Sequence, residues 1–152
     1  MTQVIQLGLL VEAVLNVIGA AVFIRYPAWC LSYVVSSDTV PPSAAVLWQI
    51  YGGLVLALTI PILLVIPNSP TVFEQRSLIF KTLTAGELVL IGVLSWHASK
   101  PIESGFTWSG LALSAMFLLP ALTWHSCAAF VLPDLMRPST RIRDNGEARK
   151  GL

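Results

Sequence analysis

Four stretches of this sequence are each long and apolar enough to cross a lipid bilayer, and they limit the fold more than any other feature. A hydrocarbon core of about 30 Å needs roughly 20 helical residues at a rise of about 1.5 Å per residue. Only 11% of the residues are charged, whereas an average soluble domain carries about 25%. The stretches cover residues 4–24, 44–66, 78–96 and 108–131. We therefore predict an all-α integral membrane protein built as a four-transmembrane-helix bundle.

The four spans and their short connections leave no room for a separate soluble domain. We assign residues 1–136 to one transmembrane domain and residues 137–152 to a polar cytoplasmic tail that we expect to be disordered. The first span lacks a basic segment before it and is interrupted by Glu12 and Asn16. We therefore expect it to stay in the mature protein and not to be cleaved off as a secretory signal.

The distribution of basic residues predicts the orientation, because Lys and Arg are retained on the cytoplasmic side of a membrane. Two of them, Arg25 and Lys100, flank the first and third connections. The other seven flank the second connection or follow the fourth span; they are Arg76, Lys81, Arg137, Arg141, Arg143, Arg149 and Lys150. Both termini are thus predicted to be cytoplasmic. We interpret Arg76 and Glu74 as an ordinary ion pair at the membrane surface, and a eukaryotic source would place the chain in the endoplasmic reticulum or another intracellular membrane.

Two acidic residues lie at membrane depth. Glu12 and Glu87 are each eight or nine residues from the predicted cytoplasmic start of their span, roughly 12 to 14 Å deep at the helical rise. They can share one layer of the bundle. Two carboxyl groups that meet in a medium of low dielectric constant should not both be ionised, so we expect at least one to hold a proton at neutral pH.

This acid pair has two interpretations. A neutral acid beside a carboxylate is an arrangement suited to general acid/base catalysis, which makes Glu12 and Glu87 candidate catalytic residues. The same pair can be a purely structural hydrogen-bonded bridge between the first and third spans. An ionisable side chain at this depth costs at least about 2.5 kcal/mol and is kept only when it is paired or useful, and both interpretations meet that condition.

Further polar and aromatic residues are candidates for binding a substrate. Asn16 follows Glu12 by four residues and extends the same helix face. Aromatic rings at the membrane boundary are expected as an interfacial belt, but they can also roof a pocket and stabilise positive charge by cation–π contact. His125 lies near the cytoplasmic end of the fourth span and is a candidate for a proton relay or a substrate contact. The candidate binding residues are Asn16, Trp48, Gln49, Tyr51, Trp96 and His125.

Several classes of function find no support in the sequence. His97 and His125 fall at opposite membrane faces and cannot bind one ion, so we expect no metal centre. Cys30 and Cys127 lie at different depths and form no C-x-x-C motif, which argues against thiol redox chemistry. There is no glycine-rich nucleotide motif and no basic stripe for nucleic acid. We expect no cofactor.

Three segments resemble the DoxX-like group of small four-helix membrane proteins. They are LGLLVEAVLNVIGAAVFIRYP at residues 7–27, LWQIYGGLVLAL at residues 47–58 and KTLTAGELVLIGVL at residues 81–94. The resemblance covers about two-thirds of the chain and implies a four-helix architecture. It leaves activity open, because the group includes quinone-linked subunits and receptor-assembly factors. In style, the chain is also similar to the small polytopic cyclases and isomerases of fungal natural-product pathways, although it is shorter than their usual seven-helix members.

Two functions are therefore weighed. The first is an integral membrane enzyme that acts on a lipophilic small molecule by proton transfer, as an isomerase or cyclase in a biosynthetic pathway. Glu12 or Glu87 would then donate a proton and the other would receive one. The second is a partner protein without enzymatic activity that assembles with another membrane protein through its small-residue faces. The oligomeric state is open in both cases, and a homo-oligomer is compatible with either.

Overall fold

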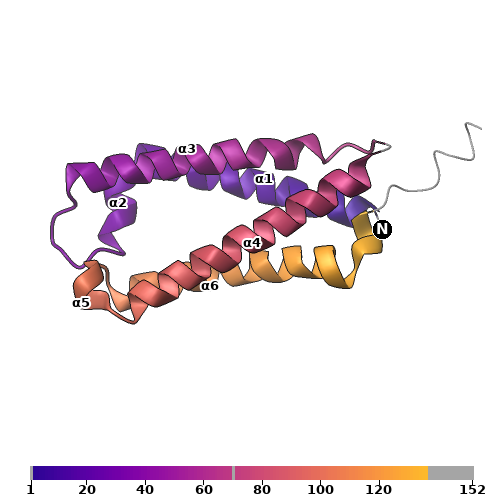
Figure 1. Cartoon of the computed structure of the whole chain (residues 1–152). Coiled ribbons are helices and arrows are strands. Elements are labelled where there is room, and N and C mark those ends of the chain that lie inside the picture. Colours follow the sequence, from indigo (N-terminus) through magenta and orange to yellow (C-terminus); the bar gives the residue numbers. More distant parts are fainter. Residues whose placement is uncertain (1, 70, 137–152) are drawn as a thin grey trace, which may run out of the picture.

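The computed structural model describes residues 2–69 and 71–136, and in this part of the chain it is helical with no strand. Four helices are long and two are short. Figure 1 shows them in the order α1 (Thr2–Arg25), α2 (Pro27–Ser32), α3 (Pro42–Leu64), α4 (Val72–Ala98), α5 (Pro101–Ser104) and α6 (Trp108–Ser126). A turn of π-helix, η1 (Cys127–Val131), continues α6, and a short 3₁₀ turn, η2 (Pro133–Met136), follows it.

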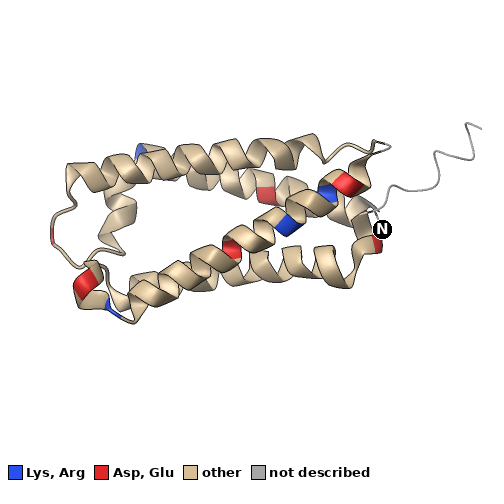
Figure 2. Ribbon diagram, in the orientation of Figure 1, with Lys and Arg blue, Asp and Glu red and all other residues tan. Residues whose placement is uncertain are grey.

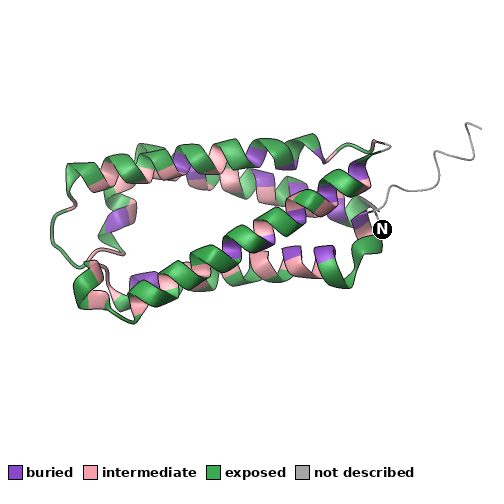
Figure 3. Cartoon of the chain, viewed as in Figure 1, coloured by how far each residue is buried: buried purple, intermediate pink, exposed green. Residues whose placement is uncertain are grey.

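The four long helices confirm the four predicted spans. Each is long and apolar enough to cross a membrane: Gln3–Arg25, Pro42–Leu64, Val72–Ala98 and Trp108–Val131. Charged residues are sparse along them (Figure 2), and much of their surface is exposed (Figure 3). The exposed side chains include large apolar ones such as Leu47, Leu64 and Leu78. Such exposure is stable in lipid and would be costly in water. The chain is thus a multi-pass helical membrane protein.

The long helices are arranged as two pairs. α1 packs along α3, and α4 packs along α6, while the two pairs diverge over much of their length (Figure 1). Within the first pair, Gly52 on α3 lets the backbones approach closely: a Cβ atom there would lie 2.9 Å from Cγ1 of Ile24 and 3.1 Å from the carbonyl oxygen of Ala20. Small residues allow this kind of close helix packing in membranes.

The two pairs meet in a hydrophobic core at one end of the bundle, the end at which the N-terminus lies (Figure 3). Residues from α1, α3, α4, η1 and η2 all contribute to it. Its largest fully buried members are Ile5, Leu9, Ile62, Phe80 and Met136. This core fixes the relative positions of the pairs next to the candidate site.

Arg76 lies in this core, and the prediction of a surface ion pair with Glu74 is wrong. The Arg76 side chain is fully buried and donates hydrogen bonds to the carbonyl oxygens of Val65 (2.9 Å), Ile66 (2.9 Å) and Met136 (3.3 Å). Glu74 is exposed. The physical reason is that α3 ends at this point with carbonyl groups that no longer have partners in the helix, and the guanidinium supplies several donors in one plane.

The opposite end of the bundle is closed by backbone hydrogen bonds between two connections. The amide of Thr107 donates to the carbonyl oxygen of Val34 (2.7 Å), and the amide of Ser36 donates to that of Gly105 (3.0 Å). Gly105 adopts a left-handed conformation with a φ of 70°, which favours glycine. The segment after α2 is thereby tied to the start of α6, so the pairs are held together at both ends.

The two ends of the described domain lie at the same end of the bundle, since η2 packs against both α1 and α4 (Figure 1). A chain that crosses a membrane four times must have both ends of its membrane domain on the same side. The side of the membrane on which they lie stays a prediction from the basic residues. The predicted tail, residues 137–152, lies outside the described residues.

Candidate functional site

His125 on α6 lies between the two acidic residues that the sequence singled out. Its Nδ1 atom is 2.8 Å from Oε1 of Glu87 on α4, and its Nε2 atom is 3.0 Å from Oε2 of Glu12 on α1. The side chains of His125, Glu87 and Glu12 are 1%, 11% and 18% exposed. These three residues, which we call the Glu–His–Glu cluster, are a polar link between the two helix pairs.

The local packing fixes the imidazole ring of His125. Phe80 contacts it from α4 with ring centroids 5.3 Å apart in an edge-on arrangement, and Phe80 also packs edge-on against Trp124 at 6.1 Å. Trp124 in turn fits against Gly8 of α1, where a Cβ atom would lie 2.5 Å from the indole ring. A larger residue at position 8 would therefore displace the Trp124 ring beside the cluster.

The structure changes the predicted acid pair in one respect. Glu12 and Glu87 do lie in the same layer of the bundle, but no hydrogen bond joins the two carboxyl groups in the part of the chain that the structure describes; both bond to His125. The histidine, which the sequence indicated only as a separate candidate, is thus the central member. One signal was available: all three residues lie within about 14 Å of the same end of their spans at the helical rise.

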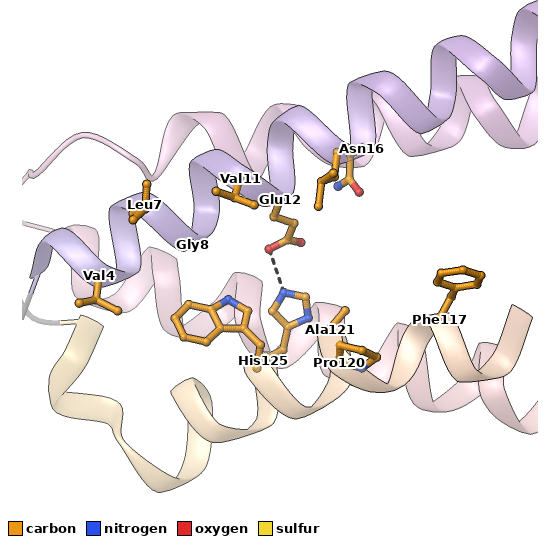
Figure 4. A pocket seen from close by; sticks show the side chains of 12 residues that line it. Val4, Leu7, Gly8, Val11, Glu12, Asn16, Phe117, Pro120, Ala121 and His125 are labelled. Carbon is orange, nitrogen blue, oxygen red and sulfur yellow. Dashed lines mark hydrogen bonds and ion pairs between the residues drawn. The ribbon is translucent and has the colours of Figure 1, made fainter. Parts of the chain in front are cut away.

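Two members of the Glu–His–Glu cluster, Glu12 and His125, form part of the wall of a cleft between α1 and α6 (Figure 4). The volume of this cleft is about 630 Å³. Glu12, Asn16 and His125 supply its polar groups, whereas Glu87 lies behind the imidazole and does not line it. The remaining lining is apolar or aromatic: Val4, Leu7, Gly8, Val11, Leu15, Phe117, Pro120, Ala121 and Trp124. A mostly apolar cleft of this size with a few converging polar groups is typical of a small-molecule site.

The other predicted binding residues fall in different places. Trp48 and Tyr51 line a second cavity, of about 550 Å³, farther along the bundle. Gln49 is exposed on α3 and donates to the carbonyl oxygen of Ile24 at 2.9 Å, so its amide joins α3 to α1. Trp96 is exposed at the end of α4, where the ammonium group of Lys100 lies 5.0 Å from its ring centroid. The structure brings neither Gln49 nor Trp96 to the cleft.

The geometry of the cluster suits proton movement. The distances of 2.8 and 3.0 Å from the two ring nitrogens to the carboxyl oxygens are those of well-formed hydrogen bonds. Imidazole can accept a proton at one ring nitrogen and release one from the other, and here each nitrogen faces a different carboxyl group. The second oxygen of Glu87, Oε2, is buried without a hydrogen-bond partner in the described part of the chain.

The described residues contain no group of three or more His, Cys, Asp or Glu side chains arranged to hold a metal ion. In the cluster itself, the two carboxyl groups contact different ring nitrogens, which point in different directions. Cys30 and Cys127 are both free thiols.

No protein-family model, curated protein or solved structure matches this chain. The resemblance to DoxX-like proteins and to polytopic cyclases therefore stays a prediction from the quoted segments.

Proposed function

We propose that this protein is a membrane enzyme that moves a proton on a lipophilic small molecule, in a reaction of the isomerase or cyclase type. The observation that carries the proposal is an imidazole held between two carboxyl groups at the wall of an apolar cleft. Polar side chains at membrane depth are costly and usually functional. The apolar lining favours a hydrocarbon-rich substrate that dissolves in the bilayer.

Each member of the cluster has a distinct role in this proposal. Glu12 lines the cleft and is the catalytic residue that touches the substrate. His125 bonds to Glu12 through Nε2 at 3.0 Å and is the group through which the Glu12 proton exchanges between turnovers. Glu87 does not reach the cleft; it holds Nδ1 of the imidazole at 2.8 Å and is a positioning residue. The arrangement resembles other catalytic sites in which a buried carboxylate orients a histidine.

The proposed step is balanced without any further reactant. The Glu12 carboxylic acid gives its proton to one carbon of a carbon–carbon double bond, whose π electrons form the new C–H bond. The resulting carbocation loses a proton from a neighbouring carbon, either directly or after ring closure, and the electrons of that C–H bond form a new double bond. The Glu12 carboxylate accepts this proton, so the enzyme returns to its starting state.

The charge of the cluster supports a proton being available for this step. Two carboxylates with one imidazolium would have a net negative charge, which is unfavourable where the dielectric constant is low. One additional proton makes the cluster neutral. A cluster with this additional proton contains one carboxylic acid, which can donate a proton to the substrate.

An isotope experiment tests the proposal even though the substrate is unidentified. The protein, purified into lipid nanodiscs, is incubated with a lipid extract of its source organism in buffer made with D₂O, and compounds are analysed by mass spectrometry. We expect deuterium in at least one apolar compound at a C–H position, above the level in empty nanodiscs. Loss of general acid/base catalysis typically lowers a rate by about 10²–10⁴-fold, and we expect this for Glu12→Gln.

Glu103→Gln is the matched control, because it removes an exposed carboxylate that is 76% accessible and pairs with Lys100. It should keep full deuterium incorporation. Incorporation that is equal in the wild type and in a folded Glu12→Gln variant would contradict the proposed role of Glu12.

Three glycines favour the second function, assembly with another membrane protein. Gly53, Gly86 and Gly92 are exposed, and a Cβ atom at each would meet nothing within 4 Å. Exposed small residues let a helix of another protein approach closely in a bilayer. Leucine at Gly86 or Gly92 would block such an association and leave the Glu–His–Glu cluster intact, so loss of a cross-linked partner in these variants would support assembly.

A further inference from the structure

Asn16 is a polar residue of α1 to which the proposed mechanism gives no role. It follows Glu12 by four residues, so the two side chains lie on one face of the helix with Cβ atoms about 5–6 Å apart. Both residues line the cleft, and Figure 4 shows their side chains projecting from α1 on the side that faces α6. The cleft thus presents a carboxamide one helical turn from the catalytic carboxyl group.

The carboxamide of Asn16 has no hydrogen-bond partner among the described residues. Two glutamines of the long helices differ in this respect: Gln6 donates to the carbonyl oxygen of Ile66 at 2.8 Å, and Gln49 donates to that of Ile24 at 2.9 Å. Asn16 is only partly buried, and neither its side-chain oxygen nor its nitrogen is closed off from the cleft. A molecule in the cleft can therefore reach both atoms.

The membrane does not supply the missing partner. Asn16 lies well inside the span Gln3–Arg25, and the hydrocarbon core of a bilayer has no water that could bond a carboxamide. On the other wall of the cleft, the lining residues of α6 that precede Trp124 are Phe117, Pro120 and Ala121, whose side chains have no hydrogen-bonding group. The partner of Asn16 is therefore a group that enters the cleft from outside the chain.

The chemistry of the site favours a neutral hydroxyl group as this partner. A carboxamide accepts at its oxygen and donates from its nitrogen, and a hydroxyl group can bond to either atom. A carboxylate in the same place would bring a second negative group close to Glu12 in a medium of low dielectric constant, which is unfavourable. A pure hydrocarbon would leave the carboxamide without any partner.

We propose that Asn16 binds a hydroxyl group of the substrate and thereby selects an unsaturated lipophilic alcohol. This inference rests on the proposed function, in which Glu12 protonates a carbon–carbon double bond. The spacing on α1 puts the hydroxyl group about one helical turn, roughly 5–6 Å, from that double bond. Asn16 determines specificity, because a site with a hydrogen-bonding group for a hydroxyl discriminates against the analogue that lacks it.

Two probes that differ in one hydroxyl group test this assignment. They are radiolabelled dodecan-1-ol and radiolabelled tridecane, in which a methyl group replaces the hydroxyl group. Both are saturated, so neither reacts by the proposed step. Binding is measured to the protein in nanodiscs, with uptake by empty nanodiscs subtracted. Affinities are expressed per mole fraction of probe in the lipid, and each variant is compared with the wild type for the same probe.

The Asn16→Leu variant removes the carboxamide with little change in side-chain size. One neutral hydrogen bond corresponds to a factor of about five to ten in affinity, so this variant should bind dodecan-1-ol about five- to tenfold more weakly and tridecane equally well. Thr82→Val is the matched control: Thr82 is exposed, donates to the carbonyl oxygen of Leu78 in its own helix and does not line the cleft, so both affinities should stay unchanged. An unchanged affinity for dodecan-1-ol in folded Asn16→Leu, or an equal loss for both probes, would overturn the inference.

A second copy of the chain is the other source of a partner, since asparagine side chains also bond across helices in a bilayer. Nanodiscs that each hold a single copy exclude this partner. The effect of Asn16→Leu on dodecan-1-ol binding should be the same in discs with one copy and in discs with two. Its loss in two-copy discs would assign the carboxamide to self-association and overturn the inference.

The isotope experiment gives a readout that needs no variant. Compounds that gain carbon-bound deuterium should contain a hydroxyl group, which trimethylsilylation reveals by a mass increase. A deuterated hydrocarbon without oxygen would overturn the inference and keep the proposed function. Binding of dodecan-1-ol that depends on Asn16 without any deuterium incorporation would keep the Asn16 site and reject the acid/base chemistry.

Discussion

Replacing His125 with phenylalanine should destabilise the protein strongly, because it removes both hydrogen bonds of the cluster at once. A phenyl ring has a similar size and can still pack against Phe80, but it leaves Glu12 and Glu87 without their partner. Removing one member of a buried ion pair costs about 3–5 kcal/mol. Neutral hydrogen bonds between membrane helices are worth only about 0.6 kcal/mol on average. A basic imidazole between two acidic groups in a buried site favours the ionised case, so we expect a loss of about 3–5 kcal/mol.

The assay is reversible unfolding in mixed detergent micelles, followed by circular dichroism. His97→Phe is the matched control, since His97 is exposed near the end of α4 and this variant should unfold like the wild type. The triple variant Glu12→Leu, Glu87→Leu, His125→Phe should regain most of the lost stability, because a buried ionic cluster can often be replaced by apolar residues without loss. A decrease of less than about 1 kcal/mol in His125→Phe would refute a charged cluster at this position.

Three further predictions concern the rest of the fold. Arg76→Met should lower the free energy of unfolding by about 2–4 kcal/mol, measured in the same micelles, because the buried carbonyl oxygens of Val65 and Met136 lose a charged donor. Gly52→Ala should lower the free energy of unfolding by about 1–3 kcal/mol, because its Cβ atom would overlap α1. Gly53 faces open space, so Gly53→Ala should leave this free energy unchanged or raise it by up to about 1 kcal/mol. Equal effects at both positions would contradict the packing of α3 on α1. In a cysteine-free background, a membrane-impermeant maleimide should label Ser37→Cys only from the non-cytoplasmic side and Thr71→Cys only from the cytoplasm, and the opposite pattern would reverse the predicted orientation.

The spans were predictable because hydropathy alone determines them. The predicted stretches and the long helices overlap along most of their length. The largest difference is at α4, which begins at Val72 and not near residue 78. Its first turns contain Glu74 and Arg76, and a hydropathy reading stops at such charges. The helix continues through them because carbonyl oxygens compensate the buried guanidinium.

The acids were predictable as candidates, but the role of His125 was not. Depth from the membrane surface places Glu12, Glu87 and His125 in neighbouring layers, yet it gives no information on which helix faces which. The contact requires that α6 presents His125 toward both α1 and α4. That rotation depends on Phe80, Trp124 and the missing side chain at Gly8, and none of these packing contacts has a sequence pattern of its own.

The hydrogen-bond partners of Arg76 could not be predicted from the sequence, for a related reason. Backbone carbonyl groups occur at every residue, so a sequence shows no acceptor that would identify a buried guanidinium. The acceptors Val65 and Ile66 directly follow α3, and Met136 comes from the far end of the described chain. The positive charge of Arg76 therefore suggested a position at the membrane surface, whereas the carbonyl groups that follow α3 stabilise it in the core.

The separation of the two helix pairs has a consequence for how a reactant would be supplied. The cleft lies between two membrane-spanning helices, α1 and α6, so under the proposed function an oily compound would first dissolve in the bilayer and then move in sideways to reach Glu12. Saturation of such an enzyme would depend on the mole fraction of the compound in the membrane. Adding more lipid at a fixed amount of compound should then slow the reaction by dilution, even though the aqueous volume is unchanged.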